Sequence, residues 1–476
     1  MERLKPDYDV LIVGAGLSGI AVAHYVQTRL PQARYAIVEA RDAIGGTWDL
    51  FRYPGVRSDS DMQTLGYSFR PWRGDEALAA GDSILRYICD TAREEAIEPH
   101  IRFRHRVTAA AWSSSDACWT VSLSSGEVTQ DVRCRFLCFC TGYYEYEKGF
   151  VPQFEGMEDY LGTLVHPQAW PQSLDYRGKR VLVIGSGATA ITIVPALARE
   201  ASHVTMVQRS PTYVLSLPGR DALAAKLPFA LARWRNILRQ QFYYTVMRLR
   251  PDAARTYIKR LNRTALGPDY DVEKHFTPRY APWDQRFCFV PDDDLFRVLR
   301  DGKASIETGE IETFTETGIR LKSGKALDAD IVVTATGFNM RLLAGIRVSV
   351  DGKNVDLSEA VVYKGMMLCG VPNAALALGY TNASWTLKCE LTARYVCRLL
   401  AYMARRGYAY CVAREPDASM ARETAVPLTS GYVSRATPHL PKQASRAPWR
   451  VYQNYVLDLA ALRFGRLRDR VMQFMR

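Results

Sequence analysis

The amino-acid sequence predicts an α/β fold with two Rossmann-like units, because one pattern of strand, glycine turn, helix and strand occurs twice. In the first copy an apolar run at 9–13 stops at Gly14, a helical pattern covers 17–30, and a second strand covers 35–39. In the second copy, strands at 180–184 and 204–208 flank a helix at 188–199. Short apolar strands that end at a glycine before a helix are typical of parallel sheets that bind dinucleotides. The sequence therefore predicts two dinucleotide-binding domains.

The segments between the copies indicate that the chain leaves the first sheet and later returns to it. A helix is predicted at 83–96, and alternating segments at 107–112, 118–123 and 134–139 predict an antiparallel excursion. The excursion ends at Thr141 and Gly142, and the strand at 331–335 ends similarly at Thr336 and Gly337. Helices are predicted near 385–405 and 451–464, with a loop at 425–448. We divide the chain into a first domain (1–145 and 341–476), a second domain (146–212 and 286–340) and a helical insertion (213–285).

Length and composition support an ordinary folded protein. A chain of 476 residues exceeds what one hydrophobic core usually serves, and 48 % hydrophobic with 24 % charged residues argues against disorder. The net charge of +12 favours anionic partners such as phosphate-bearing cofactors. The charge follows no nucleic-acid-binding module, so we expect no nucleic-acid partner.

Targeting and cysteine patterns favour a cytoplasmic protein. The opening residues 1–6 leave no room for a secretion signal, and no apolar run is long enough to span a membrane. Ten cysteines are present, without a C-x-x-C pair or zinc-like spacing. We therefore expect reduced cysteines and no metal site.

The first glycine turn predicts a site for FAD or NAD. Gly14, Gly16 and Gly19 form a G-x-G-x-x-G motif, which lets the backbone approach a pyrophosphate at a helix N-terminus. Glu39 follows 25 residues after Gly14, where a carboxylate accepts a ribose hydroxyl and repels a 2′-phosphate. Tight packing of strand against helix is the alternative interpretation of these glycines.

The second turn predicts a site for NADPH. Gly185, Ser186 and Gly187 are followed by Ala190, an accepted variant of the third glycine. Arg209 lies 24 residues after Gly185, where a guanidinium can pair with a 2′-phosphate. A solvated surface arginine is the less favoured alternative. The remaining cofactor contacts are assigned to Thr189, Gln208, Ser210, Thr336 and Gly337, and at the first site to Thr141 and Gly142.

Two such sites indicate electron transfer from NADPH to a flavin, so the first site is assigned to FAD. Disulfide reductases then use a cysteine pair, but no C-x-x-C lies near either turn. Cys138 and Cys140 alternate on a buried strand, which indicates core packing. Molecular oxygen is therefore the favoured acceptor.

The stretch 154–171 resembles the fingerprint of Baeyer-Villiger monooxygenases, which belong to the class B flavoprotein monooxygenases. Gly162, His166 and Trp170 satisfy the pattern F-x-G-x-x-x-H-x-x-x-W, with Tyr160 in place of Phe and Pro167 where Thr is usual. Together with 51–61 and 380–386, this stretch looks closest to the mycobacterial ethionamide-activating monooxygenase group. The resemblance implies that His166 and Trp170 couple cofactor binding to domain movement, although core packing at the junction stays open.

The resemblance also implies the chemistry: insertion of one oxygen atom into ketones through a C4a-peroxyflavin, with sulfides or thioamides as further substrates. Arg286 stands where these enzymes carry an essential arginine. Asp59 follows the turn of Gly46, Thr47 and Trp48, which lines the flavin in this family. A cation there stabilises a deprotonated peroxide, and Asp59 would pair with it. A structural salt bridge is the alternative.

One departure concerns Gln285, because related enzymes often have Lys directly before the active-site arginine. That Lys helps bind the 2′-phosphate, so the preference for NADPH should depend mostly on Arg209.

Residues 222–266 mix apolar side chains at helical spacing with many arginines, which predicts a helical insertion. We interpret it as a lid over the cleft between the two domains. An interfacial helix on an anionic membrane is the alternative. Two other functions also stay open: an N- or S-oxidising flavin-containing monooxygenase, and a flavin-loaded peripheral membrane or scaffold protein without turnover.

Overall fold

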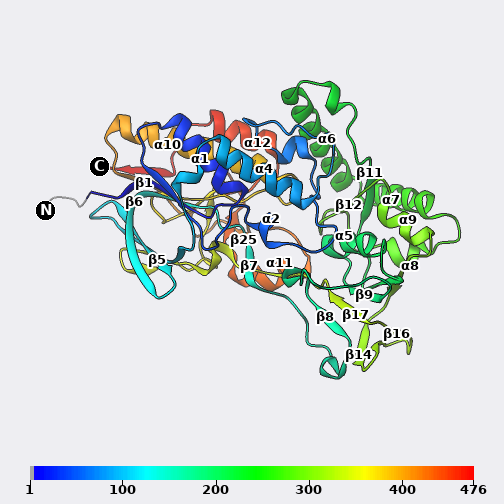
Figure 1. Ribbon diagram of the computed structural model, residues 1–476. Coiled ribbons are helices and arrows are strands. Elements are labelled where there is room, and N and C mark those ends of the chain that lie inside the picture. Colours follow the sequence, from blue (N-terminus) through cyan, green and yellow to red (C-terminus); the bar gives the residue numbers. More distant parts are fainter. Residues whose placement is uncertain (1–4) are drawn as a thin grey trace.

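The computed structural model describes residues 5–476 and contains two main sheets (Figure 1). The first sheet has the strand order β20-β19-β4-β5-β6-β1-β2-β3, with β23 beside β6. Strand β1 pairs in parallel with β2 and β6, whereas β4, β5 and β6 are antiparallel neighbours, which confirms the predicted excursion. The strands are β1 (Tyr8–Val13), β2 (Tyr35–Val38), β3 (Ile101–Arg102), β4 (Arg106–Ser113), β5 (Cys118–Ser125), β6 (Val128–Phe139), β19 (Arg347–Val350), β20 (Lys353–Asn354) and β23 (Ala374–Leu376).

Three long helices cover one face of this sheet in Figure 1: α1 (Leu17–Arg29), α4 (Gly81–Glu94) and α10 (Trp385–Arg406). Every residue of α1 from Leu17 to Val26 is buried, because α1 lies between the sheet and α10. Cys138 and Cys140 point into this same core, which confirms their packing role. The three helices predicted from periodicity are confirmed, with ends that differ by at most two residues.

The second sheet is parallel, with the order β13-β10-β9-β17-β8. One face packs against α5 and α9, and the other face packs against a small antiparallel sheet, β14–β15–β16. The second strand-helix-strand unit and the α/β fold class with two Rossmann-like units are therefore confirmed. The elements are β8 (Thr163–Val165), β9 (Arg180–Ile184), α5 (Ala188–Leu197), β10 (His203–Gln208), α9 (Asp294–Arg300), β13 (Ala304–Thr308), β14 (Ile311–Thr315), β15 (Gly318–Leu321), β16 (Ala326–Asp328) and β17 (Ile331–Thr334).

Two short paired strands connect the units. The chain leaves the first unit along β7 (Tyr144–Gly149) and returns along β18 (Phe338–Met340), and these strands pair antiparallel, with Phe338 opposite Gly149. The predicted crossings after Gly142 and Gly337 therefore lie side by side, although the exact division into domains stays a prediction.

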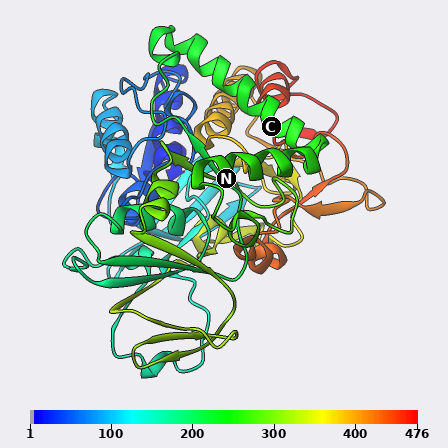
Figure 2. The same ribbon diagram turned by 90° about the vertical axis from the view of Figure 1, so that its right-hand side faces the viewer.

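The insertion contains helices α6 (Phe229–Leu249), α7 (Pro251–Leu266) and α8 (Val272–Phe276). It is bracketed by β11 (Val214–Leu217) and β12 (Cys288–Pro291), which pair in parallel. Side chains from the end of α7 and from α8 join the core of the second sheet, whereas α6 contacts α3 (Met62–Leu65) of the first unit. Helices α6 and α7 lie on the face turned toward the viewer in Figure 2.

The C-terminal part departs from the prediction. The helix expected at 451–464 begins at Tyr455, because Asn454 is extended and its side chain caps α12 (Tyr455–Leu459) by accepting the Leu457 N–H at 3.1 Å. The helix continues as a π turn at Ala460–Phe464. The segment 425–448, expected to be a loop, contains α11 (Gly431–Ala436) and β26 (Lys442–Ala444), which pairs with β25 (Arg422–Thr424).

The remaining short elements complete the described chain. They are α2 (Thr47–Leu50), β21 (Val362–Tyr363), β22 (Met367–Leu368), β24 (Tyr410–Ala413), β27 (Met472–Met475) and 3₁₀ helices at Glu98–His100, Met157–Asp159, Pro167–Ala169, Ala224–Lys226, Leu342–Gly345 and Thr437–His439. Within residues 5–476 no helix has the length and hydrophobicity that crossing a membrane requires. The same residues contain no cluster of side chains suited to a metal ion. Residues 1–4, part of the segment used to argue against a secretion signal, lie outside the described residues.

Candidate functional site

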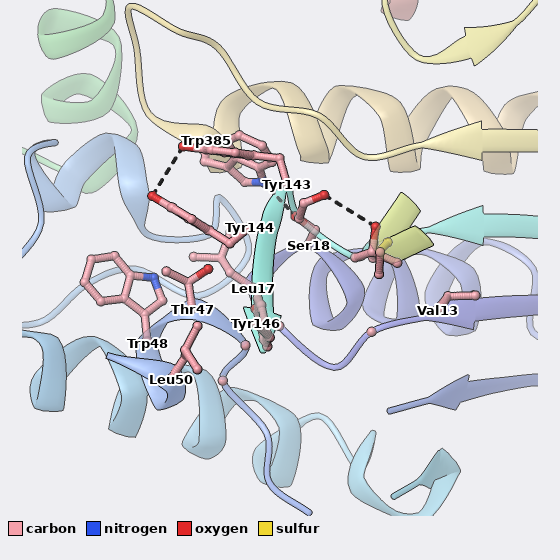
Figure 3. Close-up of a pocket in the computed structure, with 18 of the residues that line it drawn as sticks. Val13, Leu17, Ser18, Thr47, Trp48, Leu50, Tyr143, Tyr144, Tyr146 and Trp385 are labelled. Atoms are coloured by element: carbon pink, nitrogen blue, oxygen red, sulfur yellow. Dashed lines mark hydrogen bonds between the residues drawn. The ribbon is translucent and has the colours of Figure 1, made fainter. Parts of the chain in front are cut away.

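A cavity of about 500 Å³ opens at the carboxyl ends of β1 and β6, where parallel sheets place their ligands. Figure 3 shows Tyr143 and Trp385 on one side of this larger cavity, and Thr47, Trp48 and Leu50 on the other side. The rings of Tyr143 and Trp385 are in contact, with their centroids 5.2 Å apart. The predicted residues that line the cavity are Gly14, Gly16, Glu39, Gly46, Thr47, Trp48, Asp59, Thr141, Gly142 and Arg286.

The first glycine turn is built for close backbone contact. Gly14 has φ +104°, and a Cβ there would lie 2.6 Å from the Cys140 carbonyl oxygen. A Cβ on Gly19 would lie 1.9 Å from the Gly14 carbonyl oxygen, so α1 can approach β1 only with glycine at that position. Gly19 itself does not line the cavity but stands behind it. Gly16 faces Gly46 across the turn, because a Cβ on Gly16 would lie 3.5 Å from the Gly46 Cα.

Glu39 is buried at the end of β2 and turned toward the same cavity. Its Oε2 accepts the Ala15 N–H at 2.7 Å, and its Oε1 accepts the Arg41 N–H at 2.9 Å. These bonds fix the carboxylate beside the glycine turn, where an adenosine ribose is expected. The turn, the carboxylate and the cavity volume therefore fit an extended dinucleotide such as FAD.

Arg286 and Asp59 meet at the wall of the larger cavity. The Arg286 Nη2 lies 3.2 Å from the Asp59 Oδ2, and the two side chains are 34 % and 31 % exposed. Their exposed parts face the cavity, since both residues line it. The Asp59 carboxylate raises the pKa of Arg286 well above its ordinary value. The guanidinium therefore stays positively charged at every physiological pH.

A second, apolar cavity of about 80 Å³ adjoins the first and shares Tyr143, Arg286, Tyr380 and Trp385 with it. Sequence reasoning missed this apolar cavity. Its walls come from β18, the residues before Tyr380, and the C-terminal segment around α11, and no local pattern links these parts. The apolar side chains around it include Met340, Leu342, Leu378, Val426, Leu428 and Val433.

The second glycine turn is more open than the first. Gly185 has φ +139°, and a Cβ there would lie 2.2 Å from the Ala335 carbonyl oxygen, so its contact with the end of β17 is as tight as that of Gly14 with the end of β6. Gly187, in contrast, has open space around the position of a Cβ. Arg209 is exposed at the end of β10, and the Ser186 hydroxyl donates to the Ser210 carbonyl at 3.1 Å.

Two of the other predicted contacts of the second site are engaged within the protein. The Gln208 side chain is buried, and its amide donates to the His275 carbonyl and the Thr308 hydroxyl oxygen. The Thr336 hydroxyl donates to the Phe150 carbonyl at 2.6 Å. Both side chains are thus structural in this geometry, whereas Thr189 stays partly exposed at the start of α5.

The three motif residues lie outside both cavities, and His166 stands at the junction of the two units. The His166 Nδ1 accepts the Gln168 N–H, so its Nε2 carries the proton and donates to the Gly337 carbonyl at 3.1 Å. The His166 ring also covers Gly149, where a Cβ would lie 1.9 Å from its Cε1. His166 therefore contacts both connecting strands.

The other two motif residues pack within the second unit. A Cβ on Gly162 would lie 2.3 Å from the Tyr160 hydroxyl oxygen. Trp170 packs edge-on against Tyr176, beside the core of the second sheet.

Two dinucleotide-binding units with a paired cation at the first cavity define a flavoprotein oxidoreductase of the two-Rossmann type. The chain belongs to the flavin-binding monooxygenase-like family, whose model matches residues 8–406. The FAD-containing monooxygenase EthA of Mycobacterium tuberculosis (strain ATCC 25618 / H37Rv) is 50 % identical over 475 residues, which covers 98 % of this chain and 97 % of that protein. The probable FAD-binding monooxygenase AlmA of Acinetobacter baylyi is 47 % identical over 482 residues, covering 99 % and 97 %.

Solved structures share the fold. Oxidized steroid monooxygenase bound to NADP matches with a TM-score of 0.78 at 23 % identity, over 98 % of this chain and 99 % of that one. Cyclohexanone monooxygenase bound to ε-caprolactone matches with a TM-score of 0.76 at 20 % identity, over the same shares. The predicted family and enzyme class are confirmed, and the predicted FAD and NADPH agree with the cofactors named for these proteins.

Proposed function

We propose that this chain uses NADPH and molecular oxygen to insert one oxygen atom into ketones, giving esters or lactones. The observation that supports this most is Arg286, which lines both the larger cavity and the apolar cavity and pairs with Asp59 at the wall of the larger one. Bound FAD, once reduced by NADPH, supplies the electrons that activate oxygen. The names of the relatives and structural neighbours, among them an enzyme bound to a lactone, support the proposal.

Arg286 supplies the positive charge that this reaction needs at the oxygen atoms. Negative charge develops on oxygen both before and after attack on the carbonyl carbon, and a fixed cation in a cavity of low polarity stabilises it. Asp59 holds the guanidinium in place, because the pair is 3.2 Å apart. Arg286 therefore acts as an electrostatic catalyst and donates hydrogen bonds without losing its proton.

The apolar cavity supports a substrate with one carbonyl and a hydrocarbon body. Most of its lining is apolar, and its charged groups are Arg286 and the buried Lys388, which pairs with Asp458, so the carbonyl would point to Arg286 and the body toward the apolar side chains. Sulfides or thioamides fit the same space. An enzyme that oxidises only nitrogen or sulfur has less need of Arg286, since attack by an electron-rich atom requires no negatively charged oxygen.

Product analysis with Arg286→Ala tests the proposal. The variant should retain reduction of FAD by NADPH without oxygen, and lose roughly a hundredfold or more of ester formation from ketones, as for removal of one oxyanion donor. The matched control is Arg320→Ala, because Arg320 lies on β15 in an exposed pair with Glu312. A panel of linear, cyclic and aromatic ketones with one thioether, read by mass spectrometry, identifies the products. Unchanged ester yield would show that Arg286 is not the catalyst, and sulfoxide alone from the wild type would favour the heteroatom-oxidising alternative.

We further propose that the enzyme works in the cytoplasm and contacts anionic membrane surfaces through α6. Its outer face carries Leu231, Leu238, Phe242 and Leu249, which are 58 %, 54 %, 64 % and 75 % exposed. Successive positions are seven, four and seven residues apart and so form one apolar stripe. The exposed cations Lys226, Arg239 and Arg250 accompany the stripe. An apolar face with flanking positive charge is the pattern of helices that lie in a membrane interface.

Vesicle sedimentation tests this contact. The wild type should sediment with vesicles rich in anionic phospholipid and remain free of phosphatidylcholine vesicles, and the pair Leu238→Glu with Phe242→Glu should abolish sedimentation. Val128→Glu is the matched control, because Val128 is 65 % exposed on the first sheet, away from α6. Failure of the wild type to sediment overturns the membrane proposal. A dimer that the same two substitutions dissociate without lipid would instead assign the stripe to a second copy of the chain.

A further inference from the structure

Alternate residues of the segment 53–59 contact the second unit, although the segment belongs to the first. Tyr53 is 8 % exposed and lies in the core of the second sheet. A Cβ on Gly55 would lie 2.4 Å from the Thr192 carbonyl oxygen of α5, so backbone meets backbone there. The chain turns at residues 53–55, where Gly55 has φ +80° and the Val56 N–H donates to the Tyr53 carbonyl, and Arg57 then bridges Ala80. We name residues 53–59 the docking strap.

The other two residues of that series form ion pairs with one stretch of the second unit. The Arg57 Nη1 lies 2.6 Å from the Asp294 Oδ2, with Nη2 3.4 Å from Oδ1. Two residues later, Asp59 pairs with Arg286. The strap thus presents a cation and then an anion, and the facing stretch presents an anion at α9 and a cation before β12.

This reciprocal order fixes the register of the strap. If the strap slid by two residues, Arg57 would approach Arg286, and like charges would repel at low solvent exposure. The Arg57 and Asp294 side chains are only 11 % and 15 % exposed, so their pair is more shielded from water than Asp59 and Arg286. Neither residue lines the larger cavity or the apolar cavity.

Two further contacts connect the Arg57–Asp294 pair to the Arg286–Asp59 pair at the cavity wall. The Asp294 Oδ1 accepts the Leu295 N–H at 2.7 Å, which orients the carboxylate from within α9. Strand β12 runs from Cys288 to Pro291 between Arg286 and Asp294, and its pairing with β11 leaves little freedom in that stretch. A change at Asp294 would therefore be transmitted to the place where Arg286 meets Asp59.

We propose that Arg57 and Asp294 are positioning residues, whose ion pair sets the Arg286–Asp59 contact at the cavity wall. This inference rests on the proposed function, since it gives Arg286 the catalytic charge. A cation displaced by about 1 Å still binds its partner but loses as much as ~10²-fold in rate, because catalysis depends on orientation. The alternative is a salt bridge that merely joins the two units.

The test compares Asp294→Asn, Arg57→Lys and the charge swap Arg57→Asp with Asp294→Arg. In Asp294→Asn, FAD content and its anaerobic reduction by NADPH should stay within about twofold of wild type, whereas ester formed per NADPH oxidised should fall about tenfold to a hundredfold. The loss should appear in kcat and leave KM for the ketone little changed. The charge swap should recover part of the lost ester yield per NADPH oxidised, which we call the coupling. The coupling of Arg57→Lys should lie between those of wild type and Asp294→Asn, because one of the two contacts to Asp294 is kept. Glu312→Gln is the matched control, since it breaks an exposed pair in the same unit.

Hydrogen–deuterium exchange gives a readout that needs no turnover. Amides at 53–59 and 284–291 should exchange faster in Asp294→Asn than in wild type or Glu312→Gln, and the charge swap should slow them again. Unchanged coupling and exchange in Asp294→Asn overturns the inference. An equal loss of FAD reduction and of product also overturns it, because that indicates a general structural role. If wild type forms no ester, the proposed function fails, and the exchange data alone then decide whether the pair positions Arg286. If Asp294→Asn does not fold, Arg57→Lys gives the same comparison.

Discussion

The two glycine turns share a motif but differ in how the protein encloses them. In the first turn a Cβ on Gly19 would lie 1.9 Å from the Gly14 carbonyl oxygen, and Gly46 covers Gly16 from the other side. In the second turn Ala190 takes the third position, and Gly187 faces open space. The residue expected to read the ribose is buried in the first case (Glu39) and exposed in the second (Arg209).

This difference indicates how long each cofactor stays. A dinucleotide at the first turn would be enclosed by protein and held by many short contacts, as a resident group is. A dinucleotide at the second turn would be reached from solvent and held by an exposed cation, which suits a cosubstrate that enters and leaves in each cycle. Substitutions at matched positions of the two turns can break or sharpen this interpretation.

The largest effect is expected from Gly19→Ala. The added methyl group would meet the Gly14 carbonyl at 1.9 Å, which backbone shifts must relieve at a cost of about 3 kcal/mol or more. We expect loss of FAD and a lower thermal midpoint, measured by flavin absorbance after desalting and by calorimetry. Full FAD occupancy in this variant would contradict the enclosed first turn.

Next in size is Arg209→Ala. Loss of a charge-assisted contact to the 2′-phosphate should cost roughly 1.5–3 kcal/mol, about a tenfold to hundredfold rise in KM for NADPH. KM for NADH, which lacks that phosphate, should stay nearly unchanged, and FAD content should be normal. Steady-state kinetics with both nucleotides check this, and equal rises for both would exclude Arg209 as the phosphate contact.

A smaller effect is expected from Gly187→Ala, at the position that corresponds to Gly16 of the first turn. Nothing in the protein lies within 4 Å of the new methyl group, so stability and FAD content should not change. A pyrophosphate would lose close approach to the backbone, which we expect to weaken NADPH binding by about 1 kcal/mol, or several-fold. Titration calorimetry with NADP⁺ measures it, and unaltered affinity would place the nucleotide elsewhere.

The smallest effect concerns the strands between the two turns. Burial lowers the pKa of His166 below its ordinary value of 6.5, so the unfolded chain binds this proton more readily than the folded one. Stability from His166 is therefore present above about pH 6.5 and lost as pH falls toward the folded pKa. His166→Gln keeps a donor for Gly337 but cannot titrate, so the difference in unfolding free energy between wild type and variant should become smaller as pH falls from 7 to 5. Urea unfolding at several pH values measures this difference. A difference that does not change with pH would show that protonation of His166 does not affect stability.

Local sequence patterns were sufficient to predict the strands and the glycine turns, because hydrophobic periodicity and the placement of glycines depend only on residues that are neighbours in the sequence. The Arg286–Asp59 pair could be named only through family resemblance, since loops far apart in sequence bring the two together. In the insertion, the sequence does not distinguish buried from exposed arginines. By its sequence context, Arg233 is expected to be one of the solvated arginines of a basic helix. In the structure it is buried against Glu390, 157 residues away, and binds carbonyls of the first unit.

The C-terminal segment shows a different limit. Its Pro, Ser and Arg content favours a loop, yet Ser430 before α11 and Pro438 after it are ordinary boundary residues of a short helix. Tyr432 of that helix lines the apolar cavity, and the ring of Phe338 in β18 packs at a tilt against it, with the ring centroids 4.5 Å apart. Such a cavity wall depends on tertiary packing, which no window of sequence describes.

The paired strands β7 and β18 make the second unit an insert with its two ends side by side. Because Phe338 stands opposite Gly149, residues 150–337 enter and leave the first unit at one point of a two-stranded ribbon. A hairpin turn at this point would close the backbone of the first unit, but removal of residues 150–337 would also remove the partners of Tyr53, Gly55 and Glu390. The backbone connection between the two units is therefore a single two-stranded ribbon, which His166 contacts at Gly149 and at the Gly337 carbonyl.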